Sequence, residues 1–311
     1  YRRYGIMFVC FNFLYRALYI GISDTKVITY STIIMAIVNI FLDYCLIFGN
    51  FGFPEMGIGG AALASFCAEV SVFVFFTIYS YIKLTKKDYG MFKIHKLESE
   101  LMGRILKIAT PTMVQKLFSF SVWFIFFILI EKMGETATGI SSIVRSVYMI
   151  LITPCFAFAT TTNTIVSRII GEGHSDQVFS TIFKILKNCM LCTIPIIILV
   201  AIFPMQIIRI YTDDLNLAQL VIPSIYVICA GTVFQGIGNA YFEAVSGTGN
   251  TSAALYLEAV ILVIYVAFIW MMTHLTTNVH WVWTAEIIYG ALLGIFCFIY
   301  MKFAKWNKKH I

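Results

Sequence analysis

Three glutamates interrupt long apolar stretches of the sequence, and each could exchange a proton or a cation. Glu258 follows the stretch TSAALYL, Glu69 follows ALASFCA, and Glu286 lies three residues after Trp283. An ionisable side chain within a membrane segment is costly, so it is usually either functional or fixed by an internal partner. In the functional interpretation, the carboxylate releases its bound proton or cation as a substrate arrives. In the structural interpretation it forms an ion pair that locks two helices, and the sequence leaves both open.

Two basic residues lie within apolar stretches as well. Arg145 is in the middle of GISSIVRSVYM, and Lys116 lies about one turn into its stretch. A buried arginine would be stabilised by one of the carboxylates, and only bidentate geometry would make that pair strong. We therefore favour a structural ion pair for Arg145 over a functional role. Asp43 and Glu243 lie nearer to the ends of their stretches, where a carboxylate can reach the membrane interface, and we interpret both as structural.

Uncharged polar and aromatic side chains accompany these charges. Gln235 and Asn239 are four residues apart and share one helix face, and Gln115 precedes Lys116. Amides in membrane helices often join neighbouring helices, at roughly 0.6–2 kcal/mol each, and this is the favoured interpretation. The alternative is that they form the polar lining of a cavity. Trp123 could offer its ring face to an organic cation, although simple packing is favoured.

The composition predicts that lipid-embedded helices position these residues. The 311 residues are 60% hydrophobic and only 12% charged, about half the charge of an average soluble domain. A membrane span needs about 20 mostly apolar residues. We therefore predict an all-α, polytopic membrane protein. Its nine expected transmembrane helices cover roughly 4–21, 28–49, 57–82, 108–131, 137–166, 182–204, 218–245, 252–273 and 281–303.

The basic residues predict an orientation and a division of the chain. Alternate connections, beginning with GISDTK and ending with the C-terminal tail, carry 15 of the 22 Lys and Arg residues, whereas the opposite side carries four. The positive-inside rule places the C-terminus in the cytoplasm. The one long polar stretch divides the chain into three helices in 1–83, a cytoplasmic linker in 84–107 and six helices in 108–311.

Two parts of the sequence repeat a pattern. Gly21-Ile22-Ser23-Asp24-Thr25 and Gly247-Thr248-Gly249-Asn250-Thr251 each follow an apolar helix and precede another. Two spans later, each copy offers a helical carboxylate, Glu69 and Glu286. If the first three helices match the last three, the middle three should match a trio that precedes Tyr1. The sequence therefore predicts a protein with two pseudo-symmetric halves of six helices each, a known transporter architecture.

The same segments resemble a known family. NFLYRALYIGISDTK and LIFGNFGFPEMGIGGAALA look like helices four to six of the multidrug and toxic compound extrusion (MATE) family, and ATPTMVQKLFSF, IVSRIIGEG and EAVSGTGNTSAAL look like later helix ends. The resemblance covers essentially the whole chain. It implies a two-lobed antiporter in the cell membrane that exports amphipathic, often cationic drugs or toxins in exchange for Na⁺ or H⁺.

The chain departs from the family pattern at its ion sites. The aspartate that many members place in helix one would precede Tyr1. The acidic residues that some Na⁺-coupled members place in helices seven and ten fall near Ser119 and Gln235. The resemblance therefore leaves the coupling ion open between Na⁺ and H⁺, and it implies no other cofactor.

Other functions receive less support from the sequence. A lipid-linked oligosaccharide flippase of the same superfamily should line its cavity with several basic residues, and only Lys116 and Arg145 are available. A membrane enzyme should carry a catalytic cluster, yet the sequence has no H-E-x-x-H and no P-loop, and a non-transporting scaffold is the third possibility. The expected partners are the lipid bilayer and small amphipathic or cationic molecules, without nucleic acid. We expect the full-length protein to be monomeric.

Overall fold

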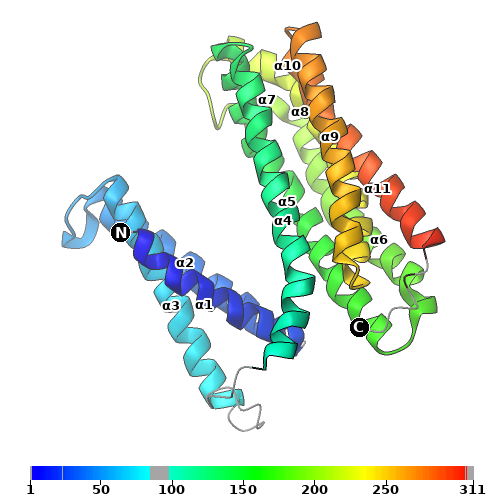
Figure 1. Cartoon of the computed structure of the whole chain (residues 1–311). Helices are drawn as coiled ribbons and strands as arrows, with labels where there is room; N and C mark the ends of the chain where they lie inside the picture. Colours follow the sequence, from blue (N-terminus) through cyan, green and yellow to red (C-terminus); the bar gives the residue numbers. More distant parts are fainter. Residues whose placement is uncertain (1, 23, 85–97, 305, 307–311) are drawn as a thin grey trace. The chain divides into compact units, whose positions relative to one another are not determined.

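The chain folds into helices that form two compact units. The computed structural model describes residues 2–22, 24–84, 98–304 and 306. The units comprise Tyr1–Leu97 and Glu98–Ile311, and we describe each by itself (Figure 1).

The first unit is a bundle of three helices. They are α1 (Arg2–Gly21), α2 (Lys26–Phe48) and α3 (Ile58–Leu84), with a short 3₁₀ turn, η1 (Asn50–Gly52), after α2. Because Gly49 adopts φ 69°, a left-handed conformation that glycine tolerates, it can end α2. Helix α3 packs along both α1 and α2, and the shared core contains Tyr19, Val27, Val72 and Phe76.

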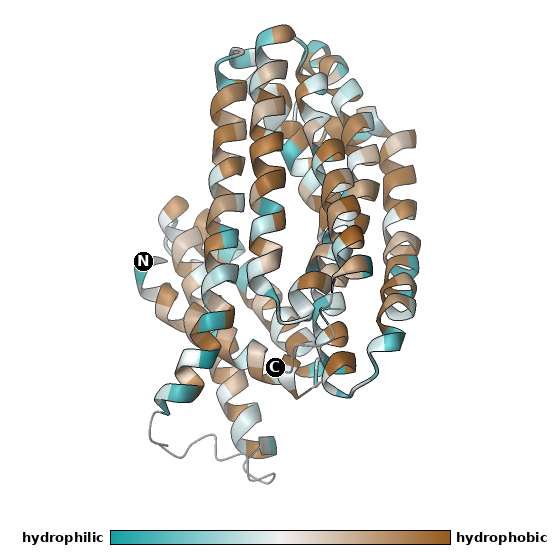
Figure 2. Cartoon of the chain, turned by 45° about the vertical axis from the view of Figure 1, so that its right-hand side comes forward, coloured by the Kyte–Doolittle hydropathy of each residue, from teal (hydrophilic) through white to brown (hydrophobic). Residues whose placement is uncertain are grey.

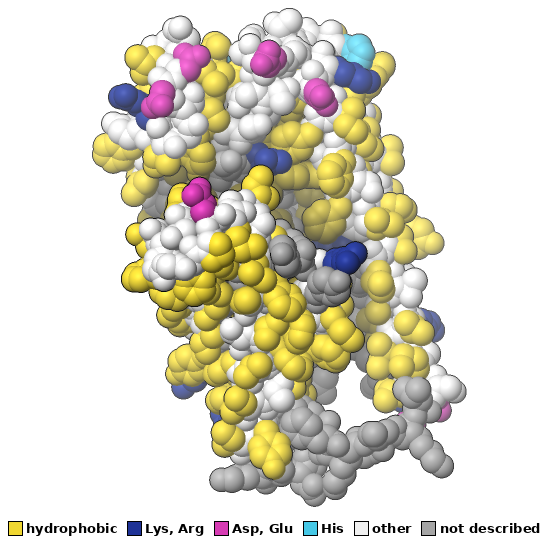
Figure 3. All heavy atoms as spheres, turned by 90° about the vertical axis from the view of Figure 1, so that its left-hand side faces the viewer, with side chains coloured by type: hydrophobic (Ala, Val, Ile, Leu, Met, Phe, Trp, Pro, Cys, Tyr) yellow, Lys and Arg dark blue, Asp and Glu magenta, His cyan; other side chains and the backbone are white. Residues whose placement is uncertain are grey.

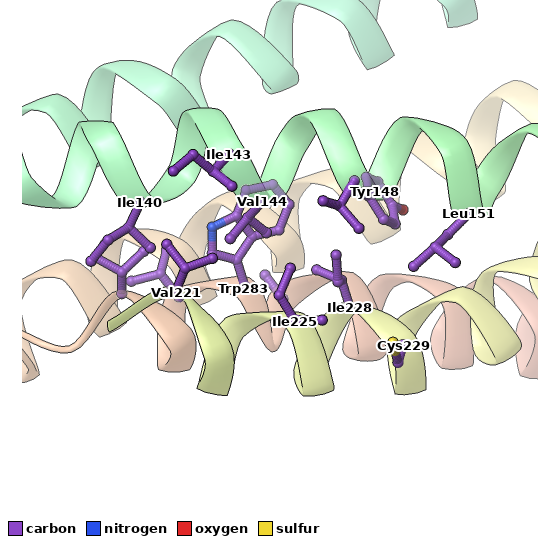
Figure 4. Close-up of a cluster of buried hydrophobic side chains, with 14 of the residues drawn as sticks. Ile140, Ile143, Val144, Tyr148, Leu151, Val221, Ile225, Ile228, Cys229 and Trp283 are labelled. Carbon is purple, nitrogen blue, oxygen red and sulfur yellow. The ribbon is translucent and has the colours of Figure 1, made fainter. Parts of the chain in front are cut away.

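The second unit contains six long helices. They are α4 (Ser99–Glu131), α5 (Glu135–Gly171), α6 (Val178–Ile202), α8 (Leu215–Gly247), α9 (Thr251–Leu275) and α11 (Ala285–Phe303). The short segments between them are η3 (Ser175–Gln177), α7 (Pro204–Ile208) and α10 (Val279–Trp283). Helix α8 packs along α5, α6 and α11, while α9 packs along α4. In the core, apolar side chains of α5 and α8 face one another around Trp283 (Figure 4).

The last predicted span is divided in two by a turn. Thr284 separates α10 from α11, and its hydroxyl donates a hydrogen bond to the backbone oxygen of Trp281 at 2.6 Å. This division places Glu286 in the first turn of α11, where the backbone N–H groups of a helix favour a negative charge.

Hydropathy agrees with a membrane-spanning bundle. Eight of the described helical segments are long and apolar enough to cross a membrane, and a shorter apolar segment, Gly5–Gly21, accounts for the first predicted span. Hydrophobic residues predominate along the long helices, and hydrophilic ones gather mainly at helix ends (Figure 2). Charged side chains are sparse on the face that Figure 3 shows. The chain is therefore an all-α, multi-pass membrane protein.

Part of the predicted linker, 84–107, is helical. Residues 85–97 lie outside the described residues, but 99–107 form the first turns of α4. The 33 residues of α4 extend to about 50 Å at 1.5 Å per residue. Since the hydrocarbon core of a bilayer is only about 30 Å thick, the helix can continue well into its polar sequence.

Candidate functional site

A cavity of about 280 Å³ lies within the second unit, between α4, α5, α8, α9 and α11. Polar side chains from different helices converge on it, although most of its lining is apolar. Seven of the nine candidate residues from the sequence line this cavity. They are Gln115, Lys116, Trp123, Gln235, Asn239, Glu258 and Glu286.

Glu286 is the most fully bonded polar group of the cavity. Its side chain is 4% exposed. Its Oε2 atom accepts hydrogen bonds from the hydroxyl of Tyr148 and from Nε2 of Gln235, each at 2.8 Å. Its Oε1 atom accepts a third from the hydroxyl of Tyr265 at 2.7 Å. The carboxylate of α11 thus joins α5, α8 and α9.

Two glycines allow α8 and α11 to approach closely at this point. A Cβ atom on Gly238 would lie 2.5 Å from the backbone oxygen of Gly290, and one on Gly290 would lie 2.6 Å from the backbone nitrogen of Gln235. Small residues at such contacts let membrane helices pack backbone to backbone. Gly290 is one turn after Glu286, so this close contact holds the Glu286 carboxylate within reach of the Gln235 amide.

Asn239 fixes the orientation of the Gln235 amide. Nδ2 of Asn239 donates to Oε1 of Gln235 at 2.9 Å and to its backbone oxygen at 2.8 Å. Because Oε1 of Gln235 is used as an acceptor, its Nε2 atom is directed at Glu286. The two amides that share one helix face therefore form a chain of hydrogen bonds from Asn239 through Gln235 to Glu286.

Glu258 differs from Glu286 in having an unused oxygen. It is 2% exposed, and its Oε1 atom accepts hydrogen bonds from Ser119 at 2.6 Å and from Tyr289 at 3.0 Å. Its Oε2 atom is buried and has no hydrogen-bond partner among the described residues. A buried acceptor without a partner is costly, so a proton bound at this oxygen would relieve that cost.

A third carboxylate, that of Glu243, lies between this cavity and a second cavity of about 310 Å³. Glu243 and Gln115 line both cavities. Glu243 accepts a hydrogen bond from Nδ2 of Asn163 at 2.9 Å, and Nζ of Lys116 lies 3.9 Å from its other oxygen. Glu243 is therefore a cavity residue as well as a helix-end carboxylate.

The two remaining candidates lie elsewhere. Glu69 is in the first unit, where its Oε2 atom accepts from Nδ2 of Asn12 at 2.7 Å. Arg145 is exposed on α5, with its guanidinium 5.1 Å from the ring centre of Phe127. Among the described residues Arg145 forms no ion pair with a carboxylate, and the expected structural pair stays a prediction. Its neighbours Val144, Val147 and Tyr148 occupy the buried face of α5 instead.

The structure adds three tyrosines that the sequence did not single out. Tyr148, Tyr265 and Tyr289 line the cavity and bond to its two buried carboxylates. A usable signal was present, because a tyrosine in the middle of an apolar helix needs a partner for its hydroxyl. The described residues contain no cluster of three or more His, Cys, Asp or Glu that could hold a metal ion.

Comparisons with known proteins give consistent results. The MatE family profile matches residues 111–271, just over half of the chain. The chain is 28% identical to the probable multidrug resistance protein NorM of Thermotoga maritima, over 96% of this chain and 64% of that protein. It is 23% identical to the probable multidrug resistance protein YoeA of Bacillus subtilis, over 99% of this chain and 67% of that protein. The chain thus spans about two thirds of the length of these relatives.

A solved structure shows the same fold. A transporter of the MOP superfamily from Pyrococcus furiosus superposes with a TM-score of 0.86 at 18% identity, over 98% of this chain and 68% of that one. The reversed polarity of that protein's binding pocket is described as suggesting a different function.

Proposed function

Since the chain belongs to the MatE family, we propose that its protein is a secondary active antiporter that exports amphipathic, cationic drugs or toxins in exchange for H⁺ or Na⁺. The observation that carries this proposal is the buried carboxylate of Glu258, which lines the cavity and whose Oε2 atom has no hydrogen-bond partner among the described residues. The protein acts in the plasma membrane, with its C-terminus in the cytoplasm, as a transporter rather than an enzyme.

The charges of the cavity support a cationic substrate. Three carboxylates line it, those of Glu243, Glu258 and Glu286, against the single ammonium group of Lys116. An organic cation would meet an excess of negative charge and the aromatic rings of Trp123 and Phe120, which attract cations through their faces. A pyrophosphate-bearing lipid would need several basic residues instead. Only Lys116 supplies one, because Arg145 does not line the cavity.

The surroundings of Glu258 suit the gain and loss of a proton. Oγ of Ser119 lies 2.6 Å from Oε1 of Glu258 and 2.9 Å from the backbone oxygen of Gln115. A serine hydroxyl has one proton to donate and can also accept. It can donate to Oε1 of Glu258 when that carboxylate is ionised, and it can continue to do so when a proton binds at the unpartnered Oε2 atom.

Exchange follows if the substrate and the coupling ion use the same carboxylate. A proton or Na⁺ on Glu258 removes the charge that attracts an organic cation, and a bound organic cation excludes the ion. Such mutual exclusion is a reciprocal coupling between the two ligands, and it lets a gradient of one drive the other outward.

Dye transport into everted membrane vesicles tests the proposal. The assay uses the complete protein as the cell makes it, a fluorescent cationic dye, and an imposed H⁺ or Na⁺ gradient. We expect dye uptake that collapses when an ionophore dissipates one of these gradients, and that is lost in Glu258→Gln. Glu172→Gln is the matched control, because Glu172 is exposed and pairs with Arg168 away from the cavity. Folded wild-type protein that moves no cationic dye under either gradient would refute the proposal.

A further inference from the structure

An apolar groove of about 700 Å³ runs between α4 and α9, separate from the polar cavity. Its lining residues recur every three or four positions on each helix, so each helix contributes one continuous face. They include Phe118, Val122 and Ile125 of α4, with Leu262, Val263 and Trp270 of α9. We refer to this feature as the α4–α9 groove.

Two aliphatic side chains form the wall between the groove and the cavity. Val122 and Leu262 line both spaces. Leu262 is one turn after Glu258 on α9, and Val122 is one turn after Ser119 on α4. The wall therefore adjoins the site where Ser119 and Glu258 meet, next to the unpartnered Oε2 atom.

We infer that the α4–α9 groove binds the hydrocarbon tail of a single-tailed amphipathic cation whose charged head binds at Glu258. The inference rests on the proposed function and specifies its substrate class. The tail passes beside the side chains of Val122 and Leu262, which line both spaces, so head and tail occupy adjoining spaces.

Size and charge both favour this occupant. Sites for drug-sized ligands usually measure about 300–1,000 Å³, and the cavity alone falls just below that range. A drug-sized ligand that places its charge at Glu258 therefore extends beyond the cavity, and the groove is an apolar space that shares Val122 and Leu262 with it. A bilayer lipid could fill the groove with an acyl chain, but a phospholipid head group carries a negatively charged phosphate, which the carboxylate of Glu258 would repel.

A blocking substitution in the complete protein tests the inference through chain-length selectivity. The substrates are alkyltrimethylammonium ions with butyl and dodecyl tails, assayed in the everted vesicles described above. Val263→Trp fills the groove, because Val263 lines it and is 70% exposed. Val260→Trp is the matched control on the same helix, since Val260 is 56% exposed and lines neither the groove nor the cavity.

We expect Val263→Trp to raise the ratio of the dodecyl KM to the butyl KM at least tenfold, and Val260→Trp to leave it unchanged. Tenfold corresponds to the lost burial of about two methylene groups, at about 0.8 kcal/mol each. If butyl export continues and both variants give the same ratio, the inference is wrong while the proposed function stands. If the wild type exports the cationic dye but neither of these ions, the inference is wrong and the proposed function stands; if it moves no dye either, the proposed function fails.

Photolabelling tests the groove without transport. A dodecyl cation with a photoreactive group at its tail end should attach to α9 between Ala259 and Trp270 in the wild type, and less in Glu258→Gln. Glu172→Gln should label like the wild type. Adducts found only outside the groove, or equal labelling in Glu258→Gln, would overturn the inference.

Discussion

Two buried carboxylates share one cavity, but their surroundings differ. Glu286 and Glu258 are 4% and 2% exposed, so burial does not distinguish them. Glu286 accepts three hydrogen bonds, and both of its oxygens are used. Glu258 accepts two on a single oxygen, and in the described part of the chain the other oxygen has no partner. The number of satisfied oxygens, rather than depth, is the difference on which we base the two proposed roles, helix joining for Glu286 and ligand binding for Glu258.

The surroundings of Glu286 and Glu258 are connected by a pair of packed tyrosines. Tyr265 donates to Glu286 and Tyr289 donates to Glu258, and their rings pack edge to face with centres 5.6 Å apart. Tyr289 is also one turn after Glu286 on α11. A displacement of Glu258 would therefore be resisted by the side chains that bond to Glu286. The following predictions distinguish the proposed ligand-binding role of Glu258 from the proposed structural role of Glu286.

The largest effect should come from removing the carboxylate of Glu286. Glu286→Ala leaves the hydroxyls of Tyr148 and Tyr265 without an acceptor, and it leaves the Gln235 amide only a 3.4 Å bond to the backbone oxygen of residue 286. At roughly 0.6–1.7 kcal/mol for each of the three lost hydrogen bonds, the free energy of unfolding should fall by about 2–5 kcal/mol. Glu258→Ala should cost about 1 kcal/mol or less, because it also removes a buried oxygen that has no partner. Reversible unfolding in mixed micelles measures both, and equal losses would contradict the distinction.

Substitution of Glu258 should slow transport more than substitution of Glu286, the reverse of their order of effect on stability. Glu258→Gln removes the charge that binds the cation, so the initial rate of dye export should fall at least tenfold, or by about 1.4 kcal/mol in the barrier. Glu286→Gln keeps an acceptor for Tyr148 and Gln235, so its rate should fall no more than about threefold, or about 0.7 kcal/mol. Vesicles with matched amounts of folded protein provide the measurement. A larger loss in Glu286→Gln would assign ligand binding to Glu286.

The fold was largely predictable, because membrane helices depend on length and hydropathy. The break at Thr284 was not, since the residues on both sides of it continue one apolar stretch. The repeat gained support from an atomic detail. Nδ2 of Asn12 donates to both Oε2 and the backbone oxygen of Glu69, and Nε2 of Gln235 makes the same two bonds to Glu286. In each case the first helix of a repeated trio bonds to the third.

The site was only partly predictable from the sequence. Polar residue types inside apolar stretches identified Glu258 and Glu286, because lipid tolerates few such groups. Their partners depend on which faces of α4, α5 and α8 turn toward the cavity. The rotation of α5 brings Tyr148 to Glu286 and leaves Arg145 exposed, and this orientation is set by packing against α8 rather than by a local pattern.

Removing single hydroxyl groups should give intermediate effects. Tyr148→Phe deletes a 2.8 Å bond to Glu286 and leaves Oε2 bonded only by Gln235, which should cost about 1 kcal/mol of stability. Tyr289→Phe deletes a longer bond of 3.0 Å, and the 2.6 Å bond from Ser119 remains, so the loss should be about half as large. Unfolding under the conditions used for the alanine variants gives the values. If Tyr289→Phe were the more destabilising, Glu258 would be the better anchored carboxylate.

The smallest effect should come from the ion pair at the edge of the cavity. Nζ of Lys116 lies 3.9 Å from Glu243, and the two side chains are 55% and 21% exposed. Ion pairs of this kind contribute roughly 0.2–1 kcal/mol. A double-mutant cycle with Lys116→Gln and Glu243→Gln should therefore give a coupling energy within that range. Since Asn163 continues to bond to Glu243, loss of Lys116 does not leave this carboxylate without a partner. A coupling energy above about 2 kcal/mol would exceed that range and place Glu243 with Glu286, as a carboxylate whose partners hold the bundle together.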